Sequence, residues 1–277
     1  MYRLPKSPRL RKPKGKVYYM RTNPVKQKLK EGGVCIGHII MEFASPGLAT
    51  ILANAQFDFV LFDTEHTRFS IETIGGMIRY ARSAGLPAFV RVPLGQYDQM
   101  SRIMDAGADG IMIPNVQNRE EAERIVRFTK YAPLGNRGTA FGIAHDDFEM
   151  GDVSETMKQA NERTLIIAQI ESVSGVENVE EIVGVEGVDV AWIGHFDLTQ
   201  SMGIPGQFEH PAYLTAVEKV ITACQRQGKA GGFMGATPDA VIELVRKGFR
   251  CIAYGSDIRI YRAALEEGLQ AIRKRLK

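Results

Sequence analysis

Residues 84–114, AGLPAFVRVPLGQYDQMSRIMDAGADGIMIP, contain two short apolar runs separated by an amphipathic segment. The runs Ala88–Val92 and Gly110–Pro114 have the length and the β-forming residues of buried strands, and Tyr97–Ala106 has helical periodicity. A glycine follows the helical segment in Ala106-Gly-Ala-Asp109, where glycine commonly ends a helix. The stretch therefore predicts a strand–helix–strand unit with parallel strands.

The same alternation extends in both directions from this unit. Eight short apolar runs rich in β-forming residues are strand candidates: Val34–Ile40, Phe57–Phe62, Ala88–Val92, Gly110–Pro114, Leu165–Ile170, Val188–Ile193, Ala230–Met234 and Cys251–Tyr254. Longer amphipathic segments between them, several entered by Ser, Asn, Asp or Pro, are helix candidates: Ile71–Ala84, Tyr97–Ala106, Arg119–Thr129, Val176–Ile182, Pro211–Gln227 and Pro238–Lys247.

This rhythm favours an α/β fold of the closed (β/α)8 type, a TIM barrel, over an open doubly wound sheet. No G-x-G-x-x-G motif follows a strand candidate, which agrees with that choice. The connection 131–163 has several glycines and no convincing strand, so we expect a long functional loop there. The amphipathic segment Ile258–Leu276 is either the eighth barrel helix or a helix that faces a partner.

Charge is distributed unevenly along the 277 residues, of which 44% are apolar and 24% are charged. Residues 1–30 hold eleven Lys or Arg and no Asp or Glu, which leaves 24 basic against 32 acidic residues for the rest of the chain. We expect residues 1–22 to be a mobile basic extension and residues 23–277 to form a single barrel domain. The extension is either a solvated tail or an arm that binds nucleic acid, and we expect no nucleic-acid partner.

Cysteine content and hydropathy bear on the location of the protein. Three scattered cysteines are too few for a disulfide framework or a zinc cluster, which indicates a reducing compartment. No apolar run approaches the ~20 residues that cross a bilayer, and the N-terminus lacks a signal-peptide core. We therefore expect a cytoplasmic protein without a membrane partner.

Polar residues follow several of the strand candidates at their carboxyl ends, where the reactive groups of a barrel lie. The second candidate leads into Asp63 and His66, the third ends at Arg91, the fifth is followed by Glu171, and the sixth by His195 and Asp197. Charged side chains at the ends of apolar strands are costly unless they have partners or a chemical role. We expect these residues to converge on one site.

Two carboxylates in this set suit a divalent metal. Glu171 and Asp197 supply hard oxygen ligands, which Mg²⁺ and Mn²⁺ prefer together with waters and substrate. The alternative is structural, with Glu171, or else Ser172 or Ser174, capping the following helix and Asp197 starting a turn.

The remaining members suit acid–base chemistry and anion binding. Asp63 can orient His66 as a general base, although a surface histidine beside an acid is also common. Arg91 can stabilise an enolate oxygen or a carboxylate, or it can simply pair with Asp63 or Glu65. No strand candidate carries a lysine near this end, so Schiff-base chemistry is not indicated.

An ordered set of motifs resembles the HpcH/HpaI aldolase family of class II pyruvate aldolases. The resemblance begins at Asn23 and runs almost to the C-terminus. The motifs are Phe-Asp-Thr-Glu-His at 62–66, Val-Arg-Val-Pro at 90–93, Asp-Ala-Gly-Ala-Asp-Gly at 105–110, Pro-Leu-Gly-Asn-Arg-Gly at 133–138, Gln-Ile-Glu-Ser at 169–172 and Asp-Leu-Thr at 197–199.

The resemblance implies a barrel of the phosphoenolpyruvate/pyruvate-domain type and specific residue roles. Glu171 and Asp197 would ligate Mg²⁺ or Mn²⁺, with Co²⁺ as a further option, and His66 with Asp63 would act as the acid–base pair. Arg91 would stabilise the pyruvate enolate. The expected substrate-binding residues are Gly194, His195, Phe196, Arg91 and Gln169.

The resemblance also concerns assembly and one departure from the family pattern. Family members commonly form hexamers of dimers that exchange a C-terminal helix, so we expect a homo-oligomer. The family usually shows Gly-Pro-Ala-Asp-Leu-Ser where this chain has Gly-His-Phe-Asp-Leu-Thr at 194–199. Phe196 therefore replaces a small residue beside the pyruvate site.

Together these features predict a metal-dependent class II aldolase, a carbon–carbon lyase. It would reversibly cleave a 4-hydroxy-2-oxo acid to pyruvate and an aldehyde through a metal-stabilised enolate. The alternatives are a malyl-thioester lyase or an oxaloacetate decarboxylase on the same scaffold, or a barrel without catalysis whose basic tail binds nucleic acid.

Overall fold

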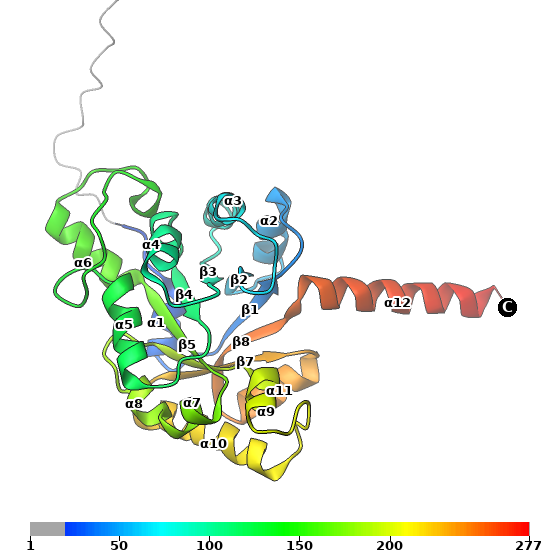
Figure 1. Cartoon of the computed structure of the whole chain (residues 1–277). Helices are drawn as coiled ribbons and strands as arrows, with labels where there is room; N and C mark the ends of the chain where they lie inside the picture. The colour runs from blue at the N-terminus through cyan, green and yellow to red at the C-terminus, as the bar shows by residue number, and fades with distance from the viewer. Residues whose placement is uncertain (1–19, 277) are drawn as a thin grey trace, which may run out of the picture.

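Eight parallel strands form a closed barrel in the computed structural model, which describes residues 20–276 (Figure 1). The strands pair in sequence order, and β1 pairs with both β2 and β8. Their bounds are β1 Cys35–Ile40, β2 Phe59–Asp63, β3 Ala88–Arg91, β4 Gly110–Ile113, β5 Leu165–Ile170, β6 Val190–Ile193, β7 Ala230–Gly235 and β8 Phe249–Ser256. The predicted (β/α)8 barrel is confirmed.

Helices connect the strands. In residues 20–276 they are α1 Pro24–Lys30, α2 Pro46–Asn54, α3 Ile71–Ser83, α4 Tyr97–Asp105, α5 Arg119–Thr129, the short 3₁₀ helix η1 Ala144–Asp146, α6 Val153–Arg163, α7 Val173–Glu177, α8 Val179–Val183, α9 His195–Ser201, α10 Pro211–Arg226, α11 Pro238–Arg246 and α12 Asp257–Arg275. As expected, the connection 131–163 contains no strand; it includes η1 and α6. The predicted helix Val176–Ile182 is instead two short helices that meet at Asn178.

Alternate residues of each strand face different cores, as the two-residue period of a strand requires. Phe59, Leu61 and Phe89 belong to the cluster inside the barrel, whereas Val60 and Phe62 belong to the cluster between the strands and the outer helices. The parity of a strand residue therefore fixes whether its side chain lies inside or outside the barrel.

Helix α1 closes the amino-terminal end of the barrel. Val25 and Leu29 join the inner cluster, and the Asn23 side chain donates hydrogen bonds to the carbonyl oxygens of Asp109 and Arg163, which lie just before β4 and at the end of α6. Part of the expected extension also packs here, because the Met20 amide donates to Gln159 Oε1 at 2.7 Å. The rest of the expected extension, residues 1–19, lies outside the described residues.

The long helix α12 leaves the barrel instead of packing in the ring of helices (Figure 1). Asp257, its first residue, is the only residue of α12 that is buried. The segment is therefore not an eighth helix packed on the barrel. Within residues 20–276, no helix has the length and apolar character needed to cross a membrane.

Candidate active site

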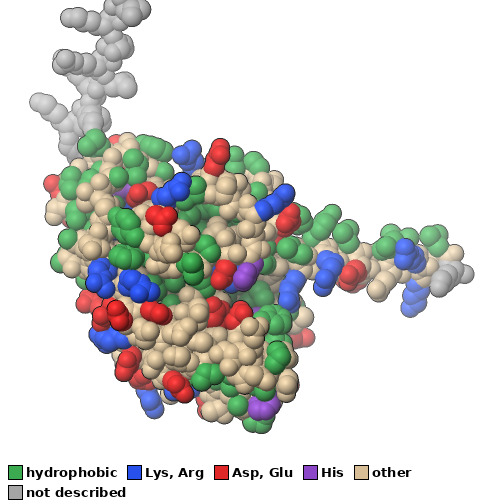
Figure 2. Space-filling model, viewed as in Figure 1, with side chains coloured by type: hydrophobic (Ala, Val, Ile, Leu, Met, Phe, Trp, Pro, Cys, Tyr) green, Lys and Arg blue, Asp and Glu red, His purple; other side chains and the backbone are tan. Residues whose placement is uncertain are grey.

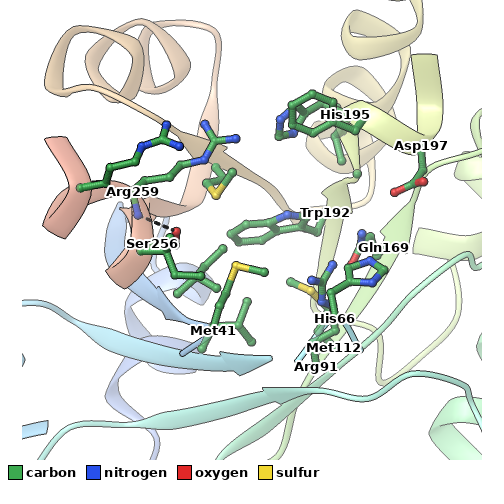
Figure 3. Close-up of a pocket in the computed structure, with 18 residues that line it drawn as sticks. Met41, His66, Arg91, Met112, Gln169, Trp192, His195, Asp197, Ser256 and Arg259 are labelled. Carbon is green, nitrogen blue, oxygen red and sulfur yellow. Dashed lines mark hydrogen bonds between the residues drawn. The ribbon is translucent and has the colours of Figure 1, made fainter. Parts of the chain in front are cut away.

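A cavity of about 620 Å³ opens at the carboxyl ends of the strands (Figure 3). Every strand contributes at least one residue to its lining: Ile39, Leu61, Arg91, Met112, Gln169, Trp192, Met234 and Ser256. His66, His195 and Asp197 line it from the loops and helices that follow β2 and β6. The structure therefore brings several of the predicted site residues to one place.

Strand parity explains why polar groups point into this cavity. Leu165 and Ile167 of β5 face the interior of the barrel, so Gln169, two residues further along, faces the same side. In β3, Phe89 is interior and Arg91 follows it on that side. In both strands the inward-facing side chains are thus apolar at first, and the last one, at the mouth of the barrel, is polar.

Arg91 is held by a pair of hydrogen bonds to Asp63. Arg91 Nε and Nη2 lie 2.8 and 2.7 Å from the two carboxylate oxygens of Asp63, which is fully buried. Glu65 adds a third contact, with its Oε2 at 3.2 Å from Arg91 Nη1. This geometry orients the guanidinium group rigidly. The ion pairs of Arg91 with Asp63 and Glu65, which were the alternative interpretation of this arginine, are both present.

His66 has a different acidic neighbour from the one expected. Its Nε2 lies 3.7 Å from Glu65 Oε2, whereas the carboxylate of Asp63 accepts hydrogen bonds from Arg91 and from the Glu65 amide at 3.0 Å. The predicted contact between Asp63 and His66 is thus replaced by one between Glu65 and His66. The reason is that Asp63 ends a strand with inward parity and meets Arg91 on the neighbouring strand.

Glu171 occupies a buried position in this group. Its side chain is 7% exposed, and its oxygens accept hydrogen bonds from the Asn115 amide at 2.8 Å and from the Gln169 side chain. Burial raises the pKa of Glu171 to about 7, and the negative charges of Asp197 and Glu65 add to that shift. Glu171 does not cap the following helix. The cap is Ser172, another of the predicted candidates, whose Oγ accepts a 3.1 Å hydrogen bond from the Gly175 amide.

Gly194 sits where no side chain would fit. A Cβ atom there would lie 2.7 Å from Gln169 Nε2 and would also collide with the Glu171 carboxylate. The glycine therefore lets β6 turn into α9 directly over these two residues. Asp197, in the first turn of α9, is consequently brought to the same cavity.

The carboxylates near the cavity suit a divalent cation that takes only one or two ligands from the protein. No group of three or more His, Cys, Asp or Glu side chains is arranged for a metal within residues 20–276. Mg²⁺, however, usually retains several waters and binds one or two carboxylates together with substrate oxygens. Glu171 and Asp197 could hold such an ion. Burial and the charge of Asp197 oppose ionisation of Glu171, and a bound cation would offset both effects.

His195 lies among aromatic rings. Its ring is stacked on Phe233 at 5.2 Å and lies 4.5 Å from Phe196, with Phe208 at 5.4 Å. Burial lowers the pKa of His195 to about 4, assisted by the positive charge of Arg259. The imidazole is therefore neutral at physiological pH. Phe196 itself is 51% exposed at the rim.

Other candidates from the sequence lie in structural positions. His210 caps α10, and His38 is buried with its Nδ1 2.8 Å from the Tyr254 carbonyl oxygen. The three cysteines are buried free thiols. The cavity residues that sequence reasoning missed include Met41, Arg259 and Arg262. The arginines lie in the first two turns of α12, and their spacing of three was the available signal.

These features define a (β/α)8 barrel with a polar cavity at the carboxyl ends of its strands. The chain belongs to the HpcH/HpaI aldolase/citrate lyase family, whose model matches residues 40–264. It is 30% identical over 248 residues to 2-keto-3-deoxy-L-rhamnonate aldolase from Escherichia coli, covering 90% of this chain and 92% of that protein.

Two solved structures support the same assignment. An HpcH/HpaI aldolase from Desulfitobacterium hafniense is 33% identical with a TM-score of 0.85, covering 90% of this chain and 96% of that one. An aldolase/citrate lyase family protein from Burkholderia cenocepacia is 30% identical with a TM-score of 0.85, covering 91% and 100%. The curated relative is an aldolase, which is a lyase.

Proposed function

We propose that the protein is a metal-dependent class II aldolase that cleaves a 4-hydroxy-2-oxo acid to pyruvate and an aldehyde. The observation that carries this proposal is the electrostatic interaction of the buried Glu171 with Asp197, which lines the cavity together with Arg91 and His66. Family membership and aldolase relatives support the reaction class.

Glu171 and Asp197 would hold the divalent cation, with Mg²⁺, Mn²⁺ or Co²⁺ as candidates. When bound, the cation supplies Lewis-acid polarisation of the 2-oxo group. Gln169 fixes one Glu171 oxygen and the Asn115 amide fixes the other, so this carboxylate is positioned before substrate arrives. Gly194 and His195 would form the wall against which the substrate lies.

The chain's own residues would carry the proton and the developing charge. His66 takes the proton of the C4 hydroxyl group, and Glu65 at 3.7 Å provides a counter-charge to the resulting imidazolium. The C3–C4 electron pair then becomes the enolate of pyruvate, while C4 leaves as the aldehyde carbonyl. Return of the proton from His66 to C3 converts the enolate to pyruvate. Arg91, oriented by Asp63, faces that enolate with fixed positive charge.

A pyruvate-release assay tests this proposal. Purified protein would be incubated with 4-hydroxy-2-oxo acids of differing length, with added Mg²⁺ or Mn²⁺ and with a chelator. We expect metal-dependent release, and a loss of at least about a hundredfold in Glu171→Gln and Asp197→Asn. Glu218→Gln, an exposed change on α10, is the matched control. Undiminished release in the presence of chelator would refute the metal requirement.

The same assay separates the alternatives on this scaffold. Oxaloacetate as substrate would reveal decarboxylation, and a malyl thioester would reveal thioester lyase activity. Cleavage of either one at a higher kcat/KM than every hydroxy-oxo acid would replace the proposed activity. An arm that binds nucleic acid would involve residues 1–22, nearly all of which lie outside the described residues.

Oligomerisation through α12 is part of the proposal. This helix carries a row of exposed apolar side chains: Ile258, Tyr261, Leu265, Leu269, Ile272 and Leu276. Figure 2 shows hydrophobic side chains along one edge of the projecting helix and Lys or Arg along the other. Helix α11 has no buried residue and exposes Ile242 and Val245. A second copy that covers these surfaces would bury them, so we propose a homo-oligomer built from dimers, with a hexamer as the expected size.

A further inference from the structure

The side of the cavity formed by α12 is basic. Arg259 and Arg262 line it together with Ser256 and Ile258. In Figure 3, Arg259 lies on the opposite side of the view from Asp197, Gln169 and His66, and Trp192 lies between them. The cavity thus has Asp197 and the expected catalytic groups on one side and the arginines of α12 on the other.

Few acidic side chains of the described residues lie close enough to neutralise Arg259 and Arg262. Within residues 20–276, no carboxylate lies within ion-pair distance of Arg259, and Arg262 has only Glu266 at 3.7 Å, where both side chains are exposed. Such exposed pairs one helical turn apart are weak. The nearby Asp257 is engaged elsewhere, since its buried carboxylate accepts hydrogen bonds from the Met41, Glu42 and Phe43 amides.

The floor between the two sides is apolar. Ile39, Met41, Trp192 and Met234 line this part of the cavity. These side chains suit a short carbon chain and offer no charged partner along its length. An elongated ligand would therefore have polar recognition at its two ends and apolar contact in the middle.

We propose that Arg259 and Arg262 bind a carboxylate or phosphate group at the far end of the aldehyde half of the substrate. This inference rests on the proposed aldolase function and names its substrate class, an aldehyde that carries an anionic terminus. Asp197, which lines the other side, repels that terminus, so the charge pattern also favours one direction for the substrate. Guanidinium groups suit both anions.

A binding measurement tests this assignment without turnover. Trp192 is the only tryptophan of the chain and lines the cavity, so its fluorescence reports on occupation. Succinate and glycerol 3-phosphate would be titrated at fixed ionic strength with Mg²⁺ and pyruvate present, and 1,4-butanediol and glycerol would serve as neutral probes. We expect at least one anion to bind, and about tenfold weaker binding in Arg259→Gln and Arg262→Gln.

Arg226→Gln is the matched control, because this exposed arginine at the end of α10 does not line the cavity. It should bind the anions as the wild type does. Equal affinity for charged and neutral probes, or unchanged anion binding in both cavity variants, would overturn the assignment. Preference between succinate and glycerol 3-phosphate decides between carboxylate and phosphate.

Kinetics in the addition direction provide the second measurement. Pyruvate would be added to succinic semialdehyde and butanal, and to glyceraldehyde 3-phosphate and glyceraldehyde. We expect the kcat/KM ratio of charged to neutral aldehyde to fall about tenfold in the two cavity variants, with the neutral aldehyde unaffected. An unchanged ratio overturns the inference. Absence of product with every aldehyde, while anion binding still requires Arg259, would refute the proposed function and leave the basic subsite supported.

Discussion

At the residue scale, the pair between Asp63 and Arg91 combines stability with positioning. Asp63 is fully buried and both of its oxygens are bonded to Arg91, whose side chain is only 16% exposed. Removing one partner of such a pair leaves the other charge buried without compensation. The Arg91 side chain would also lose its fixed orientation.

We therefore expect Asp63→Asn to lower the free energy of unfolding by about 3 kcal/mol. Glu65→Gln, at a more exposed contact with the same arginine, should cost less than about 1 kcal/mol. Urea denaturation of both variants and the wild type measures this difference. Similar losses in the two variants would mean that burial of Asp63 does not set the strength of the pair.

His38 gives stability a dependence on pH. Burial lowers the pKa of His38 below its ordinary value near 6.5, because the charged imidazole loses its hydration. The unfolded chain then binds a proton at a higher pH than the folded chain does. Stability from this residue is therefore present above the ordinary pKa and is lost as pH falls below it.

We expect the free energy of unfolding to fall between pH 7 and pH 5 more steeply in the wild type than in His38→Gln, by at most about 1.4 kcal/mol per pH unit. The glutamine amide can still donate to the Tyr254 carbonyl oxygen, which limits other damage. Urea titrations at several pH values provide the measurement. Parallel curves for the two proteins would contradict this assignment.

At the scale of elements, the turn from β6 into α9 determines whether the carboxylates converge. Gly194→Ala would push a methyl group against Gln169 and Glu171. We expect kcat/KM for pyruvate release to fall at least about tenfold, because catalytic geometry tolerates little displacement. Gly75→Ala, in α3 with open space around it, should keep full activity. Equal activity in both variants would show that the close approach is unimportant.

The elements differ in how well the sequence predicts them. Strands such as Leu165–Ile170 were recognisable because buried parallel strands are short continuous apolar runs. Helices α1 and α2 were not among the predicted helices, since they are short and each buries only two residues. The division at Asn178 was also missed, where the side chain donates to the Gln117 carbonyl oxygen at 2.8 Å, a contact between distant segments.

The sequence predicted where the site lies better than it predicted which side chains contact each other there. The carboxyl ends of parallel strands meet at one mouth, so Arg91, His66 and Asp197 were expected in one cavity and line it together. Strand register places Asp63 beside Arg91. His66 therefore meets Glu65, its immediate neighbour in sequence, and not Asp63 as predicted. Arg259 was missed because the position of the first turns of α12 beside the mouth is a property of the assembled barrel.

At the scale of the whole molecule, the proposed oligomer would form through α12. Leu265 and Leu269 are about half exposed in its apolar row. We expect Leu265→Glu combined with Leu269→Glu to yield a smaller species by light scattering coupled to size exclusion, because buried charge opposes association. Glu267→Gln, a neighbouring change outside this row, should leave the mass unchanged. A wild type that is monomeric at every concentration would refute the proposed oligomer.

The first turns of α12 border the cavity and its remaining length extends into solvent. Because α12 is one continuous helix, contacts that restrain its far end also restrain the first turns, which carry Arg259 and Arg262. Discrimination between charged and uncharged aldehydes would thus depend on protein concentration, since dilution to single subunits releases this helix.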